Sequence, residues 1–136
     1  HIGRRERLDQ SLRKKIEGAI ELTKNNTAIT VQMGLDYGGR DEITQAVGKI
    51  VASGVPPEAV TEELISQNLY TAGIPDPDLV IRTSSEMRTS NFLIWQSAYA
   101  EWIFPETYWP DFTEDIFWQM LVEYSRRDRR FGGLNS

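Results

Sequence analysis

Apolar residues recur at three- and four-residue steps along two stretches of the chain, with charged residues between them. This spacing places the apolar side chains on one face of a helix. It predicts helices from Leu8 to Thr23 and from Asp41 to Ala52. Charged residues at their ends predict a short helix near Thr61 to Gln67 and a last helix from about Thr113 towards the arginines at 126–130. Acidic residues in the first turn of the last helix and basic residues near its end suit the helix dipole.

Three shorter apolar runs are rich in the β-branched and aromatic residues that favour strands. They predict strands at Ala28–Leu35, at Asp78–Arg82 and at 102–104. Strands that alternate with helices indicate an α/β fold with a mostly parallel sheet flanked by helices.

Two further segments are expected to start helices just after a strand. Gly38 and Gly39 lie where the first strand meets the second helix, and paired glycines there favour a role in backbone geometry over a phosphate-cradling turn. Ser90 can cap a helix that continues to Tyr99.

Composition excludes several function classes. The chain has 136 residues, a formal net charge of -5 and no cysteine. An acidic chain does not favour non-specific binding of nucleic acid, and a chain without cysteine has no disulfides or thiolate metal sites. We expect a cytoplasmic protein. The opening residues His1, Ile2 and Gly3 read like a loop that leaves an earlier strand, so we expect an upstream part to be missing.

The best candidate for chemistry follows the strand that ends at Arg82. In open α/β sheets, ligands bind beyond the carboxyl ends of the strands. Arg82, Arg88 and Ser90 lie there, and guanidinium groups match the oxygens of a diphosphate. A helix amino end at Ser90 would add backbone donors. The alternative is that both arginines pair with Glu86 and Asp78 at the surface.

Glu101 is the candidate metal ligand. It lies between apolar residues, where a carboxylate needs a cation or hydrogen bonds. Mg²⁺ is the natural metal, because it needs few protein carboxylates and shares its shell with water and phosphate. A salt bridge is the alternative. Seven aromatic residues are expected to belong to the core, or else to line an apolar channel or a subunit contact: Trp95, Tyr99, Trp102, Trp109, Phe112, Phe117 and Trp118.

Ordered motifs along the chain resemble the cis-prenyltransferases, the isoprenyl transferases of the undecaprenyl diphosphate synthase type. The motifs are Tyr37-Gly38-Gly39-Arg40, the run 76–83, Glu86, Arg88, Ser90-Asn91-Phe92-Leu93, Trp95-Gln96, the run 98–101, Trp109-Pro110-Asp111-Phe112 and the run 129–133.

The resemblance implies a Mg²⁺-dependent, cytoplasmic transferase in which isopentenyl diphosphate units are added with cis geometry to an allylic diphosphate such as farnesyl diphosphate. The product would be a polyprenyl diphosphate of the undecaprenyl type, the lipid carrier for cell-wall sugars. Arg82, Arg88 and Ser90 would bind isopentenyl diphosphate, and Glu101 would bind Mg²⁺. The enzyme would be a homodimer whose Arg130 and Gly132 reach the neighbouring subunit's site, with transient contact at the membrane surface.

The resemblance also has departures. The family's amino-terminal Asp-Gly-Asn-Gly-Arg-Trp segment has no match, so residues 1–136 look like the carboxy-terminal part of one prenyltransferase domain, and we expect them to be inactive alone. Asp36 stands where the family usually has Asn, and Ser85 where it usually has Gly. The alternative function is a non-catalytic accessory subunit of a heteromeric cis-prenyltransferase.

Overall fold

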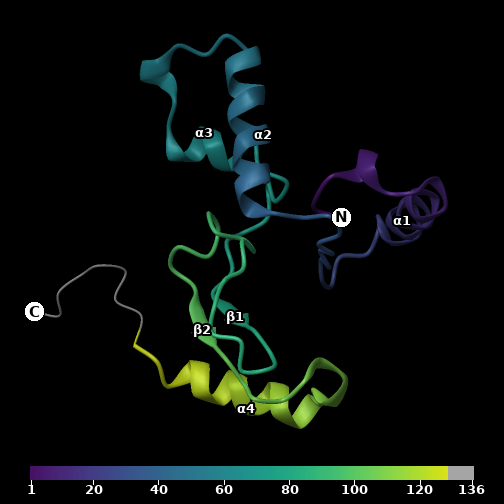
Figure 1. Cartoon of the computed structure of the whole chain (residues 1–136), viewed down its shortest axis with the longest axis vertical. Helices are drawn as coiled ribbons and strands as arrows, with labels where there is room; N and C mark the ends of the chain where they lie inside the picture. Colours follow the sequence, from purple (N-terminus) through teal and green to yellow (C-terminus); the bar gives the residue numbers. More distant parts are fainter. Residues whose placement is uncertain (129–136) are drawn as a thin grey trace, which may run out of the picture. The chain divides into compact units, whose positions relative to one another are not determined.

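A computed structural model describes residues 1–128, which fall into two compact units (Figure 1). The first unit runs from His1 to Ile74, and the second begins at Pro75. Among the described residues, no helix is long and apolar enough to cross a membrane.

The first unit contains two short 3-10 helices that were not predicted, η1 (Arg5–Arg7) and η2 (Pro57–Ala59). Its three α-helices lie close to their predicted positions: α1 (Gln10–Thr23), α2 (Gly39–Ala52) and α3 (Glu62–Ser66). Side chains cap two of them: the Asp9 carboxylate accepts from the Leu12 amide at 3.0 Å, and the Thr61 hydroxyl accepts from the Leu64 amide at 3.1 Å. Each cap satisfies a backbone donor that the helix itself leaves unpaired.

The predicted strand at Ala28–Leu35 is wrong as a strand. The segment forms a single parallel bridge, between Gly34 and Ile2. A ladder needs a partner along its whole length, and among the described residues this segment forms its backbone hydrogen bonds with Ile2 alone.

A buried carboxylate joins the parts of the first unit that pack together. Glu42, on α2, is 1% exposed. It accepts a hydrogen bond from the Tyr37 hydroxyl at 2.5 Å and another from the Tyr70 amide at 2.7 Å. Glu42 therefore ties the turn before α2 to the segment after α3, beside the buried apolar residues Ala46, Ile50 and Leu69.

The second unit is built on two parallel strands, β1 (Leu79–Ile81) and β2 (Glu101–Ile103). They bury Val80 and Ile103. After β2 come η3 (Trp109–Asp111) and α4 (Glu114–Ser125), which Thr113 caps through a bond from the Ile116 amide at 3.4 Å. The predicted parallel pairing and last helix are thus confirmed.

The predicted helix from Ser90 to Tyr99 is wrong. This stretch is a series of turns, and the backbone of Ser90, Asn91 and Leu93 is left-handed, with φ angles of 45°, 65° and 45°. Left-handed residues cannot continue a right-handed helix. A helix amino end is therefore not available at Ser90.

The expectation that the aromatic residues form the core is wrong for four of them. Tyr99, Trp109, Phe117 and Trp118 are 69%, 74%, 41% and 57% exposed. Helix α4 contains no buried residue. These four side chains lie at the surface of the second unit rather than in its interior.

The loop after β1 also holds a left-handed pair, Ser84 and Ser85, with φ angles of 69° and 53°. Their amides donate to the carbonyls of Thr107 at 2.9 Å and Pro105 at 3.1 Å, which fixes the loop against the segment after β2. The loop thus requires at Ser85 the backbone conformation for which glycine is best suited.

Replacing Glu42 with alanine should lower the free energy of unfolding by about 2–4 kcal/mol, because it removes the acceptor of two part-buried hydrogen bonds and opens a cavity at a buried position. Denaturant titration followed by circular dichroism measures the change. Glu17→Ala, at an exposed position of α1, is the matched control and should change stability by less than about 0.5 kcal/mol. Equal losses in both variants would contradict the role of Glu42.

Replacing Ser85 with glycine should raise the free energy of unfolding by about 0.5–1 kcal/mol, because relief of the left-handed strain exceeds the entropy that glycine adds to the unfolded chain. The control is Ser53→Gly, since Ser53 has a φ angle of -79° and gains nothing from glycine. Thermal unfolding compares the two. A higher free energy of unfolding in Ser53→Gly, or an unchanged one in Ser85→Gly, would show that the left-handed backbone of Ser85 does not destabilise the protein.

Candidate functional site

The site begins where β1 ends. The Arg82 amide donates to the Ile103 carbonyl at 3.0 Å, so Arg82 is held against the carboxyl end of β2 as well as that of β1. This is the edge of a parallel sheet at which ligands bind. The parallel register therefore places Arg82 at the carboxyl end of the sheet, as predicted from the sequence.

Two arginines meet one carboxylate on the loop that follows. The same oxygen, Oε2 of Glu86, lies 3.5 Å from Nη2 of Arg82 and pairs with Nη2 of Arg88. Arg82 also donates through Nη1 to the backbone carbonyl of Arg88. The structure thus brings Arg82 and Arg88 together through Glu86, one of the two carboxylates of the surface alternative.

The ion pairs with Glu86 also indicate which kind of ligand Arg82 and Arg88 can bind. One anionic oxygen held by two guanidinium groups is the arrangement that a phosphate oxygen takes between two arginines. The side chains of Arg82, Glu86 and Arg88 are 26%, 37% and 65% exposed, so a ligand from solvent can reach the group. Binding an anion there would displace Glu86 from both arginines.

Ser90 lies two residues beyond Arg88 in an exposed turn. Because no helix starts there, the backbone donors that were expected from a helix amino end are absent from the site within the described residues. The remaining contribution of this segment is its side-chain hydroxyl, which can donate one hydrogen bond.

Glu101 lies at the other end of the strand pair. It is opposite Leu79 in the ladder, so Arg82 is three residues further along, roughly 10 Å in the strand direction. Its Oε2 accepts from Nη1 of Arg127 at 2.9 Å, and Arg127 also binds Glu123 at 2.5 Å. These contacts, with Glu101 first, raise the pKa of Arg127 above its ordinary value and keep it charged.

The described residues supply only part of the ligand shell that a magnesium ion needs. They contain no group of three or more His, Cys, Asp or Glu that could hold a metal. Glu101 can supply one carboxylate, and a diphosphate and water can complete a Mg²⁺ shell. The salt-bridge alternative for Glu101 is what the structure shows, with Arg127 as its partner. Arg130 and Gly132 lie outside the described residues.

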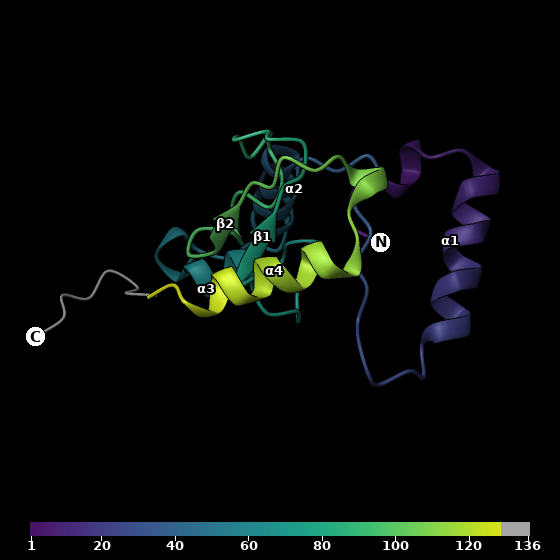
Figure 2. The same cartoon turned by 90° about the horizontal axis from the view of Figure 1, so that it is seen from below.

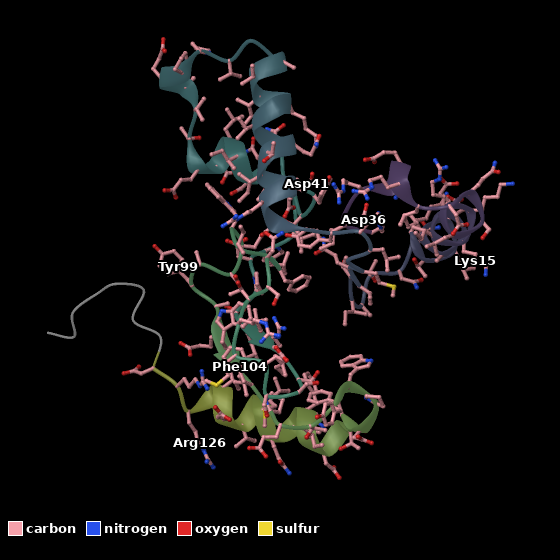
Figure 3. All side chains as sticks on the ribbon, in the orientation of Figure 1. Lys15, Asp36, Asp41, Tyr99, Phe104 and Arg126 are labelled. Carbon is pink, nitrogen blue, oxygen red and sulfur yellow. The ribbon has the colours of Figure 1, made fainter. Side chains whose placement is uncertain are left out.

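Asp36 stands where the family usually has Asn, and its negative charge is neutralised within the first unit. Its backbone is left-handed, with a φ angle of 49°, and its carboxylate pairs with Arg4 at 3.1 Å and with Arg7 at 3.4 Å. Arg4 also reaches Asp41 at 3.4 Å, and its hydrogen bond to Asp36 raises the pKa of Arg4. Figure 3 labels both carboxylates, which lie on the approach to α2 and at its start. The extra negative charge is therefore offset by two arginines.

Sequence reasoning missed these two arginines and two other residues. Arg4 and Arg7 lie about thirty residues from Asp36 in the chain, and no local pattern links them. Gly3 has a φ angle of 118°, and a Cβ there would overlap the Leu35 carbonyl oxygen. For Glu42, the signal was its polar character on the apolar face of a predicted helix. By contrast, Gly38 has an extended backbone, with φ of -156°, that any residue can adopt.

Comparisons with known proteins agree along almost the whole chain. The family described as "Putative undecaprenyl diphosphate synthase" matches residues 1–132. The isoprenyl transferase of Agrobacterium fabrum is 48% identical over 137 residues, which cover 98% of this chain and 56% of that protein. The trans,polycis-polyprenyl diphosphate synthase of Thermobifida fusca, described as specific for (2Z,6E)-farnesyl diphosphate, is 50% identical over 96% of this chain and 48% of its own length.

Two crystal structures share the fold. A probable undecaprenyl diphosphate synthase from Campylobacter jejuni superimposes with a TM-score of 0.86 and 37% identity, over 96% of this chain and 61% of the other. Lavandulyl diphosphate synthase from Lavandula x intermedia, solved with dimethylallyl diphosphate, gives a TM-score of 0.93 and 36% identity, over 96% and 58%. The predicted α/β class is confirmed.

The chain spans about half the length of the curated relatives it matches. The matched family covers every described residue, and the structural likeness extends over 96% of the chain. The chain belongs to the undecaprenyl diphosphate synthase family of isoprenyl transferases.

Proposed function

We propose that this chain supplies the isopentenyl diphosphate site of a cis-prenyltransferase that extends an allylic diphosphate to a polyprenyl diphosphate. One observation carries the proposal: Arg82 and Arg88 converge on a single anionic oxygen at the carboxyl end of a parallel strand. The relatives are named isoprenyl transferases and polyprenyl diphosphate synthases, and one solved relative holds an allylic diphosphate.

The residues of the site have separate tasks in this proposal. The guanidinium groups of Arg82 and Arg88 bind the diphosphate oxygens of isopentenyl diphosphate, and the Ser90 hydroxyl donates one further bond. Neutralising that diphosphate lets the double bond of isopentenyl diphosphate approach the second, also anionic, substrate. Arg82, the less exposed arginine, positions the group, and Arg88 closes over it from the more exposed side.

A bound Mg²⁺ would assist departure of the allylic diphosphate by stabilising its developing charge. Glu101 is its proposed ligand in this chain. Because Arg127 now holds Oε2 of Glu101, binding a metal there requires Arg127 to turn towards Glu123 alone. Arg130 and Gly132 stay predicted contacts to a second subunit of a homodimer, and contact with the membrane surface stays a prediction as well.

The activity is tested in a chain of the relatives' length. Residues 1–136 are joined to the part of the Agrobacterium fabrum enzyme that they do not match, and the product is assayed with farnesyl diphosphate, radiolabelled isopentenyl diphosphate and Mg²⁺. We expect chain-extended lipid. A folded chimera that extends nothing would overturn the proposed function.

In that chimera, Arg82→Ala should lower kcat/KM for isopentenyl diphosphate by roughly 100-fold, because it removes a charge-assisted contact to the diphosphate. Most of the loss should appear in KM for this substrate, and KM for farnesyl diphosphate should stay within about twofold. The matched control is Arg5→Ala, an exposed arginine of η1, which should leave both constants unchanged. A loss of similar size in Arg5→Ala would mean that general charge, not the site, is responsible.

Glu101→Gln should raise the Mg²⁺ concentration needed for half-maximal rate by about tenfold or more, because an amide is a weaker ligand than a carboxylate. Glu123→Gln removes the other partner of Arg127 and serves as the control. If both variants shift the Mg²⁺ dependence equally, Glu101 acts through Arg127 and is not a metal ligand.

A further inference from the structure

A second pair of arginines converges on one carboxylate, this time in the first unit. Nη2 of Arg4 lies 3.1 Å from Oδ1 of Asp36, and Nε of Arg7 lies 3.4 Å from Oδ2 of the same side chain. The proposed isopentenyl diphosphate site of the second unit has the same arrangement around Glu86. Each unit therefore holds two guanidinium groups around one internal anion.

The backbone places this pair of arginines at the carboxyl end of a parallel pairing. Ile2 and Gly34 form a parallel bridge, and two residues further along both segments the Arg4 amide donates to the Asp36 carbonyl at 3.1 Å. Figure 2 shows the segment after α1 returning to the amino end of the chain before it enters α2. The carboxyl ends of parallel strands are where ligands bind in α/β proteins. The arginines thus lie at the same kind of edge as the site of the second unit.

The amino end of α2 adjoins the same group. Asp41, in the first turn of this 14-residue helix, pairs through Oδ1 with Nη1 of Arg4 at 3.4 Å. A helix amino end carries a partial positive charge that favours anions. An anion bound to Arg4 would therefore gain from the helix as well.

The ion pairs satisfy these side chains only in part. Among the described residues, Nε of Arg4 and Oδ2 of Asp41 are buried and have no hydrogen-bond partner. The Arg4–Asp41 and Arg7–Asp36 contacts of 3.4 Å are longer than the roughly 2.7–2.9 Å of a well-formed charge-assisted hydrogen bond. A buried donor without an acceptor is costly, so an added anionic oxygen that reaches it is favoured. The Arg7 side chain is 59% exposed and can be reached from solvent.

We propose that Arg4 and Arg7 form a second anion site, which takes a diphosphate group, and that Asp36 competes with this ligand for both arginines. Two guanidinium groups suit an anion with several oxygens and more than one charge. The family usually has Asn at position 36, and a neutral amide does not compete in this way. This chain therefore binds the anion more weakly than the same chain with Asn at that position. The inference rests on the proposed function, because that reaction offers two sources of diphosphate: the allylic substrate and the ion that it releases.

The experiment is an NMR titration with inorganic diphosphate of the chain that carries Arg82→Ala, which disables the site of the second unit. Side-chain Nε signals of Arg4 and Arg7 should shift along one saturable curve. Adding Asp36→Asn should lower the dissociation constant by about fivefold or more, because the competing carboxylate is gone. Asn tolerates the left-handed backbone of Asp36, so the substitution introduces no backbone strain.

Two matched controls separate the site from general charge. Glu6 is an exposed carboxylate whose charge also acts on Arg4, and Glu6→Gln should change the dissociation constant by less than about twofold. Arg7→Ala should weaken binding by about tenfold. Arg5→Ala removes an exposed arginine of the same helix, η1, and should leave binding unchanged.

A titration with dimethylallyl diphosphate identifies the source of the ligand. Binding at least as tight as that of inorganic diphosphate assigns the site to the allylic substrate, and weaker binding assigns it to the released ion.

Three results overturn the proposal: shifts of Arg4 and Arg7 that do not saturate, an Asp36→Asn variant that binds no more tightly, or equal losses in Arg7→Ala and Arg5→Ala. None of these readouts depends on Arg82 or on prenyl transfer, so the proposal can fail while the proposed function stands.

Discussion

Parallel pairing of β1 with β2 is the constraint on which the second unit depends. Two short strands share one register, and that register decides which groups can act together. It places Arg82 at the carboxyl end, against the chain beyond Ile103, and it places Glu101 at the opposite end. The backbones of Arg82 and Glu101 therefore lie roughly 10 Å apart along the strands. The proposed anion site and the proposed metal ligand thus start from opposite ends of the strand pair.

Ion pairs explain why the Arg82–Arg88 site and Glu101 are stable without ligands. Glu86 neutralises two arginines, and Arg127 joins Glu101 to Glu123. Each ligand in the proposed reaction would have to replace a partner that is already bound. Exposed ion pairs contribute little to stability, so such exchanges cost little when the incoming group carries more charge. In the first unit, ion pairs with Arg4 and Arg7 neutralise the carboxylate of Asp36 in the same way.

The helices and the parallel pair could be predicted because their signals are local. Apolar periodicity located α1 and α2, and charged residues suited to the helix dipole located α3 and α4. Thr61 and Thr113 cap the starts of α3 and α4. The turns after Ser90 could not be predicted in this way. Their left-handed residues include Ser and Leu, which have no preference for that backbone, so tertiary contacts must impose it. Likewise, residues 28–35 have the pattern of a strand, but among the described residues they form only a single bridge, to Ile2. A pattern records what a segment can bury rather than what lies beside it. At the site, the sequence already named Glu86 as a possible partner of Arg82 and Arg88, and the structure shows these ion pairs. The pairing of Glu101 with Arg127 could not be predicted, because the two residues lie 26 positions apart in the chain.

The central claim is that Arg82 and Arg88 form one diphosphate site, and an NMR titration of the 136-residue chain with inorganic diphosphate tests it most directly. Signals of arginine side-chain Nε groups report on each guanidinium separately. The account predicts that the Arg82 and Arg88 signals shift together along one saturable curve as Glu86 is displaced, while the exposed Arg5 signal follows only the ionic strength. Shifts of equal size at all three arginines, or no saturable shift at Arg82, would contradict it.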